Sequence, residues 1–90
     1  MAQVFTQEIV SSRVEKIIRR QVGSDTPLSA ETHLQDDLGM DSLELVELGV
    51  TLENEFSVFV PDADVRRCAT LSDVIQLVLR AESEEKVRSA

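Results

Sequence analysis

The chain has 90 residues and a mass of 10.0 kDa, enough for one small domain. Its formal net charge of −8 argues against a nucleic-acid binder, which needs a basic surface, and against docking on anionic membranes. The single cysteine excludes an internal disulfide and a multi-cysteine metal site, and we expect no metal. The sequence has neither a long apolar stretch nor a secretory signal pattern, so we expect a cytoplasmic protein that does not insert into membranes.

The first predicted helix begins at Thr6, whose side chain can cap it, and ends after Val22 at Gly23. Phe5 precedes the cap and is expected to contact Val10 four residues inside the helix. The apolar residues recur at helical spacing and form one face, made up of Val10, Val14, Ile17 and Ile18. A long connection, 24–40, follows, and its leucines are expected to anchor it in the core.

Three further helices are predicted after this connection. Asp41 and Glu44 form a capping box at the start of the second helix, which runs to about Phe56. A short third helix spans about residues 63–67, and a fourth begins within 70–73. We expect a core over about 6–81, followed by a polar tail, 82–90. The sequence therefore predicts an all-α fold, a small four-helix bundle with a long loop between its first two helices.

The second helix carries two apolar stripes on different faces. The core stripe consists of Leu45, Leu48, Gly49, Leu52 and Phe56. The other stripe consists of Leu43, Val46 and Val50 and is flanked by Glu44, Glu47 and Glu53. This second stripe is either a contact surface with an acidic rim or a surface that the long loop covers. Gly49 indicates either close helix packing or space left for a ligand.

The negative charge is concentrated in the middle of the chain. Residues 31–64 hold ten acidic residues and no basic one, a balance of −10. A solvated acidic face is one interpretation of this distribution. The complete lack of basic residues over a third of the chain favours the other, a docking surface for a basic partner.

Ser42 lies in the first turn of the predicted second helix, where unpaired N–H groups and the helix dipole favour a phosphate. Simple helix capping is the alternative. No Gly-x-Ser-x-Gly pattern surrounds Ser42, and His33 is the only histidine that could serve as its base, so we do not predict a hydrolase. A calcium loop over 36–47 fails because Leu38 and Met40 occupy ligand positions.

Residues 37–43, which read DLGMDSL, are followed by VEL at 46–48 and LENEF at 52–56. With these flanks the chain resembles the acyl carrier proteins. The resemblance extends to RVEKII at 13–18, to VPD at 60–62 and to TL at 70–71, so that it covers about residues 10–79.

The resemblance implies that Ser42, between Asp41 and Leu43, carries 4′-phosphopantetheine, which a separate phosphopantetheinyl transferase takes from coenzyme A. The thiol of this arm, rather than a buried and inert Cys68, would hold the acyl group as a thioester, so the protein would not be an enzyme. Acyl transferases and ketoacyl synthases with basic patches would dock on the second helix of a monomeric carrier. The acyl chain would lie between the helices, against Leu45, Leu48, Gly49 and Leu52.

The resemblance leaves the pathway open between fatty-acid and polyketide-type biosynthesis. Gly49, Arg66 and Arg67 depart from the pattern of fatty-acid synthesis, as do both ends of the chain. These departures favour a carrier dedicated to one pathway, in which the altered third helix excludes wrong partners by charge. An unmodified acidic adaptor that binds a basic protein is the alternative function.

Overall fold

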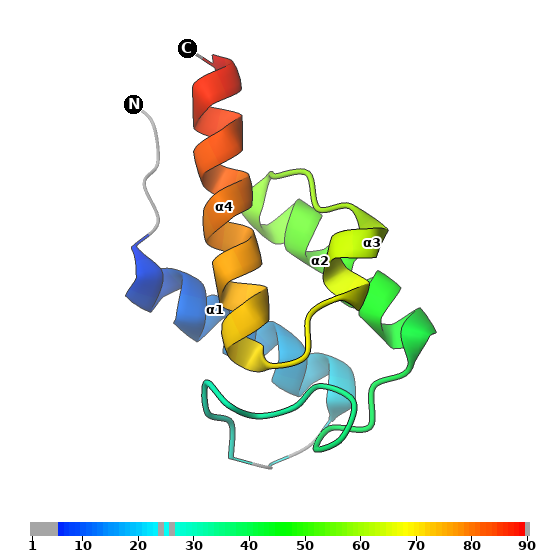
Figure 1. The fold of residues 1–90 in the computed structure, drawn as a ribbon. Coiled ribbons are helices and arrows are strands. Elements are labelled where there is room, and N and C mark those ends of the chain that lie inside the picture. Colours follow the sequence, from blue (N-terminus) through cyan, green and yellow to red (C-terminus); the bar gives the residue numbers. More distant parts are fainter. Residues whose placement is uncertain (1–5, 24, 26, 90) are drawn as a thin grey trace.

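The computed structural model describes residues 6–23, 25 and 27–89, the last five of them through the backbone alone. The chain forms four helices, which are α1 (Gln7–Val22), α2 (Ser42–Phe56), α3 (Asp62–Arg66) and α4 (Leu71–Ser89). Figure 1 shows α4 beside α1 and the short α3 beside α2. The described residues contain no strand, only an isolated bridge between His33 and Thr70. The prediction of an all-α bundle is confirmed.

Local sequence signals set the two ends of α1. Thr6 Oγ1 accepts a hydrogen bond from the N–H of Ile9 at 3.2 Å, as expected of an N-cap. Gly23 adopts a φ of +62° and donates its N–H to the carbonyl of Arg19, a left-handed cap that glycine adopts without steric cost. The predicted contact of Phe5 lies outside the described residues.

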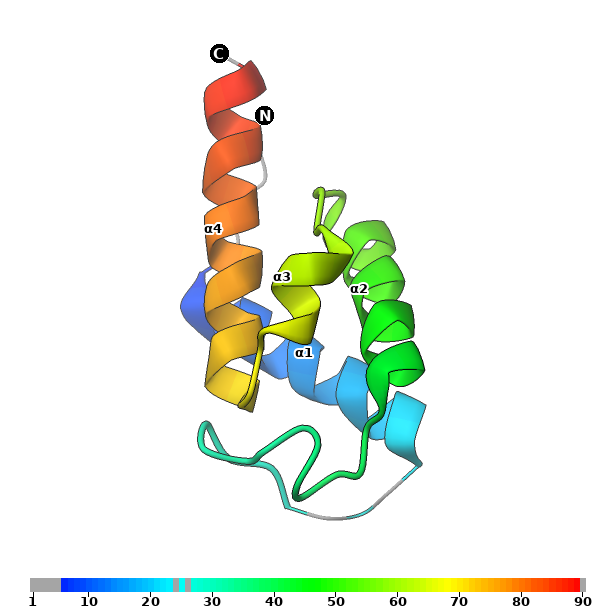
Figure 2. The same ribbon diagram turned by 45° about the vertical axis from the view of Figure 1, so that its right-hand side comes forward.

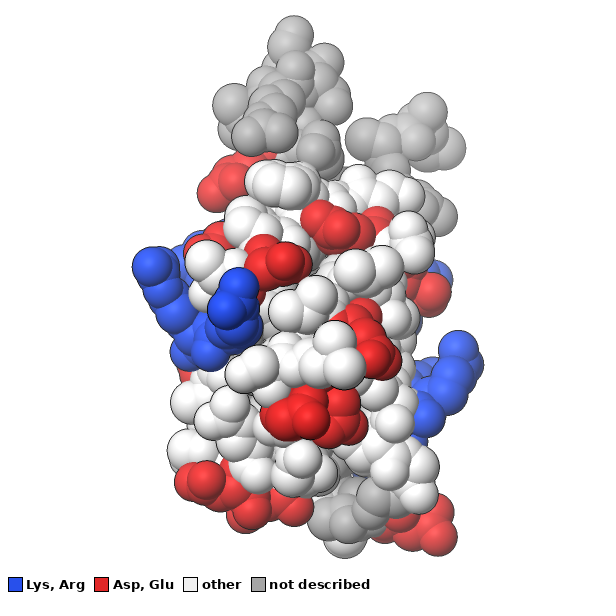
Figure 3. All heavy atoms as spheres, turned by 90° about the vertical axis from the view of Figure 1, so that its right-hand side faces the viewer, with Lys and Arg blue, Asp and Glu red and all other residues white. Residues whose placement is uncertain are grey.

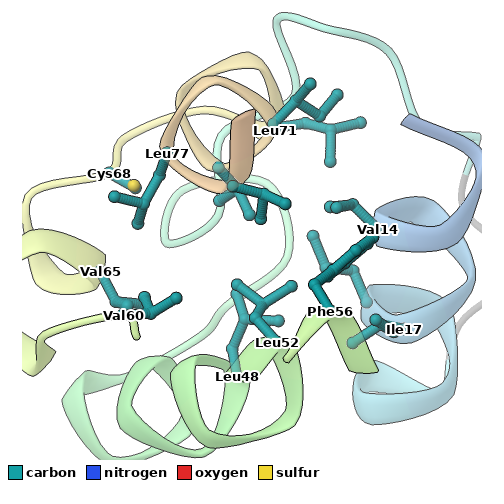
Figure 4. Packing of buried hydrophobic residues seen from close by; sticks show 14 of the residues in the cluster. Val14, Ile17, Leu48, Leu52, Phe56, Val60, Val65, Cys68, Leu71 and Leu77 are labelled. Atoms are coloured by element: carbon teal, nitrogen blue, oxygen red, sulfur yellow. The ribbon is translucent and has the colours of Figure 1, made fainter. Parts of the chain in front are cut away.

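The core is aliphatic and draws on all four helices (Figure 4). Val14 of α1, Leu52 of α2, Val65 of α3 and Val78 of α4 are fully buried in it. Phe56 is the one aromatic residue of this cluster among the described residues. Burying such side chains supplies the main stabilisation of a small domain, since each contributes on the order of 1.5–3 kcal/mol.

The long connection between α1 and α2 is tied to the segment between α3 and α4. Leu34 donates its N–H to the carbonyl of Ala69 at 2.9 Å, and Leu71 donates its N–H to the carbonyl of Thr32 at 3.0 Å. Leu34 and Met40 are buried, so apolar contacts add to this backbone pairing. Figure 2 shows the loop passing below the bundle, away from the side of α2 that faces outward. The described part of the loop is thereby held in place without covering the outward side of α2.

Two predicted helix boundaries need correction. α3 begins at Asp62, one residue earlier than expected, and ends at Arg66. The expectation that the last helix fades out into the tail 82–90 is wrong, because α4 continues to Ser89. Residues 82–89 are polar except for Val87 and contain neither glycine nor proline, and their Glu, Lys and Arg residues favour helix. Polarity shows that a segment lacks a core partner; it does not end a helix.

α4 begins within 70–73 as predicted, and side chains of this segment cap its start. Asp73 Oδ2 accepts hydrogen bonds from the N–H groups of Ala69 at 2.9 Å and Thr70 at 3.1 Å, and Thr70 Oγ1 accepts one from the N–H of Asp73. The two backbone donors hold the pKa of Asp73 below its ordinary value, because they stabilise the ionised carboxylate. This cap therefore stabilises the segment to which the long loop is hydrogen-bonded.

Candidate functional site: Ser42 and the outer face of α2

Ser42 is the first residue of α2, and its side chain is exposed. Asp41 caps the helix, since its Oδ1 accepts a hydrogen bond from the N–H of Glu44 at 2.8 Å. Glu44 Oε1 in turn accepts one from the N–H of Asp41 at 3.2 Å, which completes the predicted capping box. Gly39, with a φ of +70°, lies in the turn just before this cap. The serine is therefore held at a well-defined helix start.

The first turn of α2 leaves hydrogen-bond donors beside the Ser42 hydroxyl. The capping box uses the amides of Asp41 and Glu44, and the amides of Ser42 and Leu43 have no acceptor within the helix. These two N–H groups and the positive end of the helix dipole suit an anion attached at Ser42. The site can thus accommodate a phosphodiester on the serine.

A side chain of α1 holds this first turn in place. Gln21 Nε2 donates a hydrogen bond to the main-chain carbonyl of Glu44 at 2.6 Å. The bond connects residues 23 positions apart and is partly buried. Gln21 was not predicted as a site residue, because no local sequence pattern indicates a hydrogen bond between a side chain at the end of one helix and the backbone of another helix.

The outer stripe of α2 is open in this chain. Leu43 is 67% exposed and Val50 49%, while Val46 is half-buried. The sequence left open whether the long loop covers this stripe, and the described part of the loop does not. Figure 3 views this side of the molecule and shows acidic side chains along its middle, with basic ones towards both edges. Next to Ser42, therefore, lies an apolar stripe among carboxylates.

The inner stripe of α2 is packed. Leu45, Leu48 and Leu52 are buried, and so is Gly49. A Cβ atom added at Gly49 would lie 3.0 Å from Val65 Cγ2, which is tighter than ordinary contact. Of the two interpretations of Gly49, the structure supports close packing of α2 against α3.

Comparison with known proteins agrees with this geometry. The family described as "Phosphopantetheine attachment site" matches residues 12–78. The chain is 39% identical to an acyl carrier protein of Thermotoga maritima over 74 residues, which cover 81% of this chain and 91% of the relative. It is 38% identical to one of Clostridium acetobutylicum over 78 residues, which cover 86% of this chain and all of the relative.

The chain belongs to the acyl carrier protein family. A solved structure, the acetyl actinorhodin acyl carrier protein from Streptomyces coelicolor, superposes with a TM-score of 0.74 at 27% identity, covering 94% of this chain and 99% of the other. The protein is therefore a carrier and not an enzyme, and its prosthetic group is a covalently attached 4′-phosphopantetheine. The exposed hydroxyl and neighbouring amides at Ser42 fit such a phosphate-linked arm.

The three carboxylates predicted to flank the carrier's outer stripe differ in their surroundings. Glu47 is exposed, and its carboxylate has no hydrogen bond or ion pair with the described residues. Glu44 is half-buried, and one of its carboxylate oxygens is used in the capping box. Glu53 Oε2 accepts a hydrogen bond from the N–H of Val60 at 2.8 Å, so this carboxylate ties α2 to the loop before α3. The spacing of the sequence does not distinguish these three roles.

A cleft of about 690 Å³ lies between the carrier's α3 and α4. Phe59, Cys68, Leu77 and Arg80 are among the residues that line it, and none of the four residues predicted to line an acyl-chain pocket does so. Burial raises the pKa of the Cys68 thiol to about 11, and Asp73 and Asp64 add to this effect. Cys68 is thus a thiol at neutral pH, which agrees with its predicted inertness.

The remaining candidates of the carrier have no visible chemical role. His33 is an exposed loop residue, with Nδ1 at 3.8 Å from Asp36 Oδ2. Within the described ranges there is no cluster of three or more His, Cys, Asp or Glu side chains able to hold a metal ion. No helix among the same residues is long and apolar enough to span a membrane.

Proposed function

We propose that Ser42 is the attachment point of the phosphopantetheine arm, with Asp41 and Leu43 completing the recognition segment around it. The observation that carries this proposal is an exposed serine in the capped first turn of α2, inside the region that matches the family. A phosphopantetheinyl transferase would bring the Ser42 hydroxyl to the pyrophosphate of coenzyme A. The serine oxygen would form a phosphodiester with the arm, the pyrophosphate bond would break, and adenosine 3′,5′-bisphosphate would leave. The terminal thiol of the arm then carries acyl groups as thioesters.

The outer face of α2 is the surface that partner enzymes would contact. Leu43, Val46 and Val50 offer an apolar centre, and the rim consists of Glu44, Glu47 and Glu53. Interfaces of this kind combine an apolar core with a charged rim that guides the encounter. Transferases, acyl transferases and ketoacyl synthases with basic patches fit it. Glu47 is the rim residue most available to these enzymes, because its carboxylate has no hydrogen bond or ion pair with the described residues.

The acyl chain would lie between the helices, against Leu45, Leu48, Gly49 and Leu52. These residues are buried together, so a bound chain must displace packed side chains rather than enter an open channel. We place the carrier in fatty-acid or polyketide-type biosynthesis, as a carrier dedicated to one pathway that works as a single domain and a monomer. A buried free thiol is compatible with the reducing cytoplasm.

The test is to incubate the chain with coenzyme A and a broad-specificity phosphopantetheinyl transferase and to measure its mass. We expect a gain of one phosphopantetheine group that Ser42→Ala abolishes. Ser12→Ala is the matched control, since Ser12 is exposed on α1, and this variant should be modified like the original chain. No gain in mass, or a gain that persists in Ser42→Ala, would refute the proposal.

A thiol reagent provides a second readout of the same experiment. The arm ends in an accessible thiol, whereas Cys68 is buried and protonated. A maleimide at neutral pH should therefore label the modified chain rapidly and the unmodified chain slowly. Equal labelling before and after modification would show that the arm is missing or that Cys68 is accessible.

A further inference from the structure

α3 changes its charge along its short length. Asp62 and Asp64 lie in its first turn, while Arg66 and Arg67 lie at its end. Only Val65 separates these two arginines from residues 31–64, which contain no basic residue. Both arginine side chains are exposed. The basic end of α3 is thus an abrupt exception within the acidic half of the molecule.

α3 packs beside α2, so its basic end lies next to the helix that carries the acidic face. Val65, immediately before the arginines, packs against Gly49 in the middle of α2, with its Cγ2 only 3.0 Å from where a Cβ would be. A larger residue at Gly49 would have to displace the Val65 side chain. Figure 3 shows basic side chains at the edge of the acidic strip, on the side seen in that view. An enzyme lying across α2 therefore meets α3 as well.

The arginines are not neutralised by the carboxylates of α2. Arg66 forms no ion pair with any described residue. The pairing of Arg67 Nη1 with Asp64 Oδ1 spans 4.0 Å, and the Arg67 side chain is 82% exposed, so solvent screens this contact and it contributes little. Both positive charges therefore act on whatever approaches the end of α3.

We propose that Arg66 and Arg67 form a selectivity element beside the docking face. They repel an enzyme whose docking surface is basic throughout, and they favour an enzyme that places an acidic side chain opposite the end of α3. Specificity between similar partners requires such a repulsive element in addition to attractive contacts, and like charges brought together at an interface slow association. The inference rests on the proposed function, because the docking face is defined by its position next to Ser42.

The test uses a phosphopantetheinyl transferase with a uniformly basic docking surface and follows kcat/KM for modification. At low salt we expect Arg66→Glu to raise kcat/KM about threefold, and Arg66→Glu with Arg67→Glu to raise it about tenfold, through faster association. Both gains should shrink at high salt because ions screen exposed charges. Lys16→Glu is the matched control, since Lys16 is exposed on α1, and it should leave kcat/KM within about twofold.

A second arm reverses the charge on the enzyme. A transferase variant with Glu in place of a basic residue opposite α3 should prefer the original carrier to the double variant. An unchanged or lowered kcat/KM for Arg66→Glu with the basic enzyme, at an unchanged melting temperature, would overturn the selectivity proposal. If the original chain is not modified at all, the proposed function fails instead, so the two failures are distinguishable.

Discussion

The inner and outer faces of α2 both carry an apolar stripe, but only the inner stripe is buried in the fold. On the inner face Leu45 is 1% exposed and Leu48 is completely buried, whereas Leu43 on the outer face is 67% exposed. The inner face packs against the other three helices, with α3 closest at Gly49. The outer face has no partner within the described residues, and carboxylates flank it.

This difference shows which part of α2 serves stability and which part is available for function. A helix of a small bundle needs one buried stripe, and the inner face provides it. Leaving a second apolar stripe in water has no benefit for folding, and exposed apolar patches with a polar rim mark interaction sites. Substitutions on the inner face should therefore lower stability, whereas substitutions on the outer face should leave stability nearly unchanged and alter association with partners.

The largest effect on stability is expected from truncating a leucine on the inner face. Leu48→Ala should lower the free energy of unfolding by about 2–5 kcal/mol, because it removes buried contacts and leaves a cavity. Leu43→Ala is the matched control on the outer face and should change stability by less than about 0.5 kcal/mol. Urea unfolding followed by circular dichroism measures both. Equal losses would mean that Leu43 is buried in solution.

A smaller effect is expected from adding a side chain where α2 meets α3. Gly49→Leu should lower stability by about 1–3 kcal/mol, because the new side chain has to displace Val65. Val50→Leu, one position further along on the outer face, should be within about 0.5 kcal/mol of the original. If Gly49→Leu is as stable as Val50→Leu, the space beside Gly49 is larger than this packing indicates, and an acyl-chain site there becomes plausible.

The smallest effect on stability, but a clear one on association, is expected at Glu47. Because its carboxylate is exposed and has no internal partner, Glu47→Lys should leave stability within about 0.5 kcal/mol. It should lower kcat/KM with a phosphopantetheinyl transferase more at low than at high salt, since salt screens exposed charges. Glu31→Lys makes the same change of charge in the long loop and should lower kcat/KM less. Identical losses at both ionic strengths would argue against a steering role.

Much of the fold could be predicted from the sequence because its signals are local. Thr6, Gly23 and the Asp41–Glu44 pair mark helix ends through hydrogen bonds that span at most four residues. The end of α4, the boundary predicted least well, had no such stop signal, and polarity alone does not end a helix. The position of Ser42 in the first turn of a capped helix was predictable for the same local reason.

The sequence by itself determined the four helices, the two stripes of α2, the concentration of acidic residues in 31–64 and the serine at a helix start. The tertiary structure decided which stripe is buried and that the long loop turns away to pair with Ala69 and Leu71. It also brought Glu53 to Val60, Gln21 to α2 and Val65 of α3 against Gly49. The physical reason is the distance along the chain over which each effect acts. Caps and helical periodicity act within a few residues, whereas burial and contacts between side chains depend on distant segments that meet only when the chain packs.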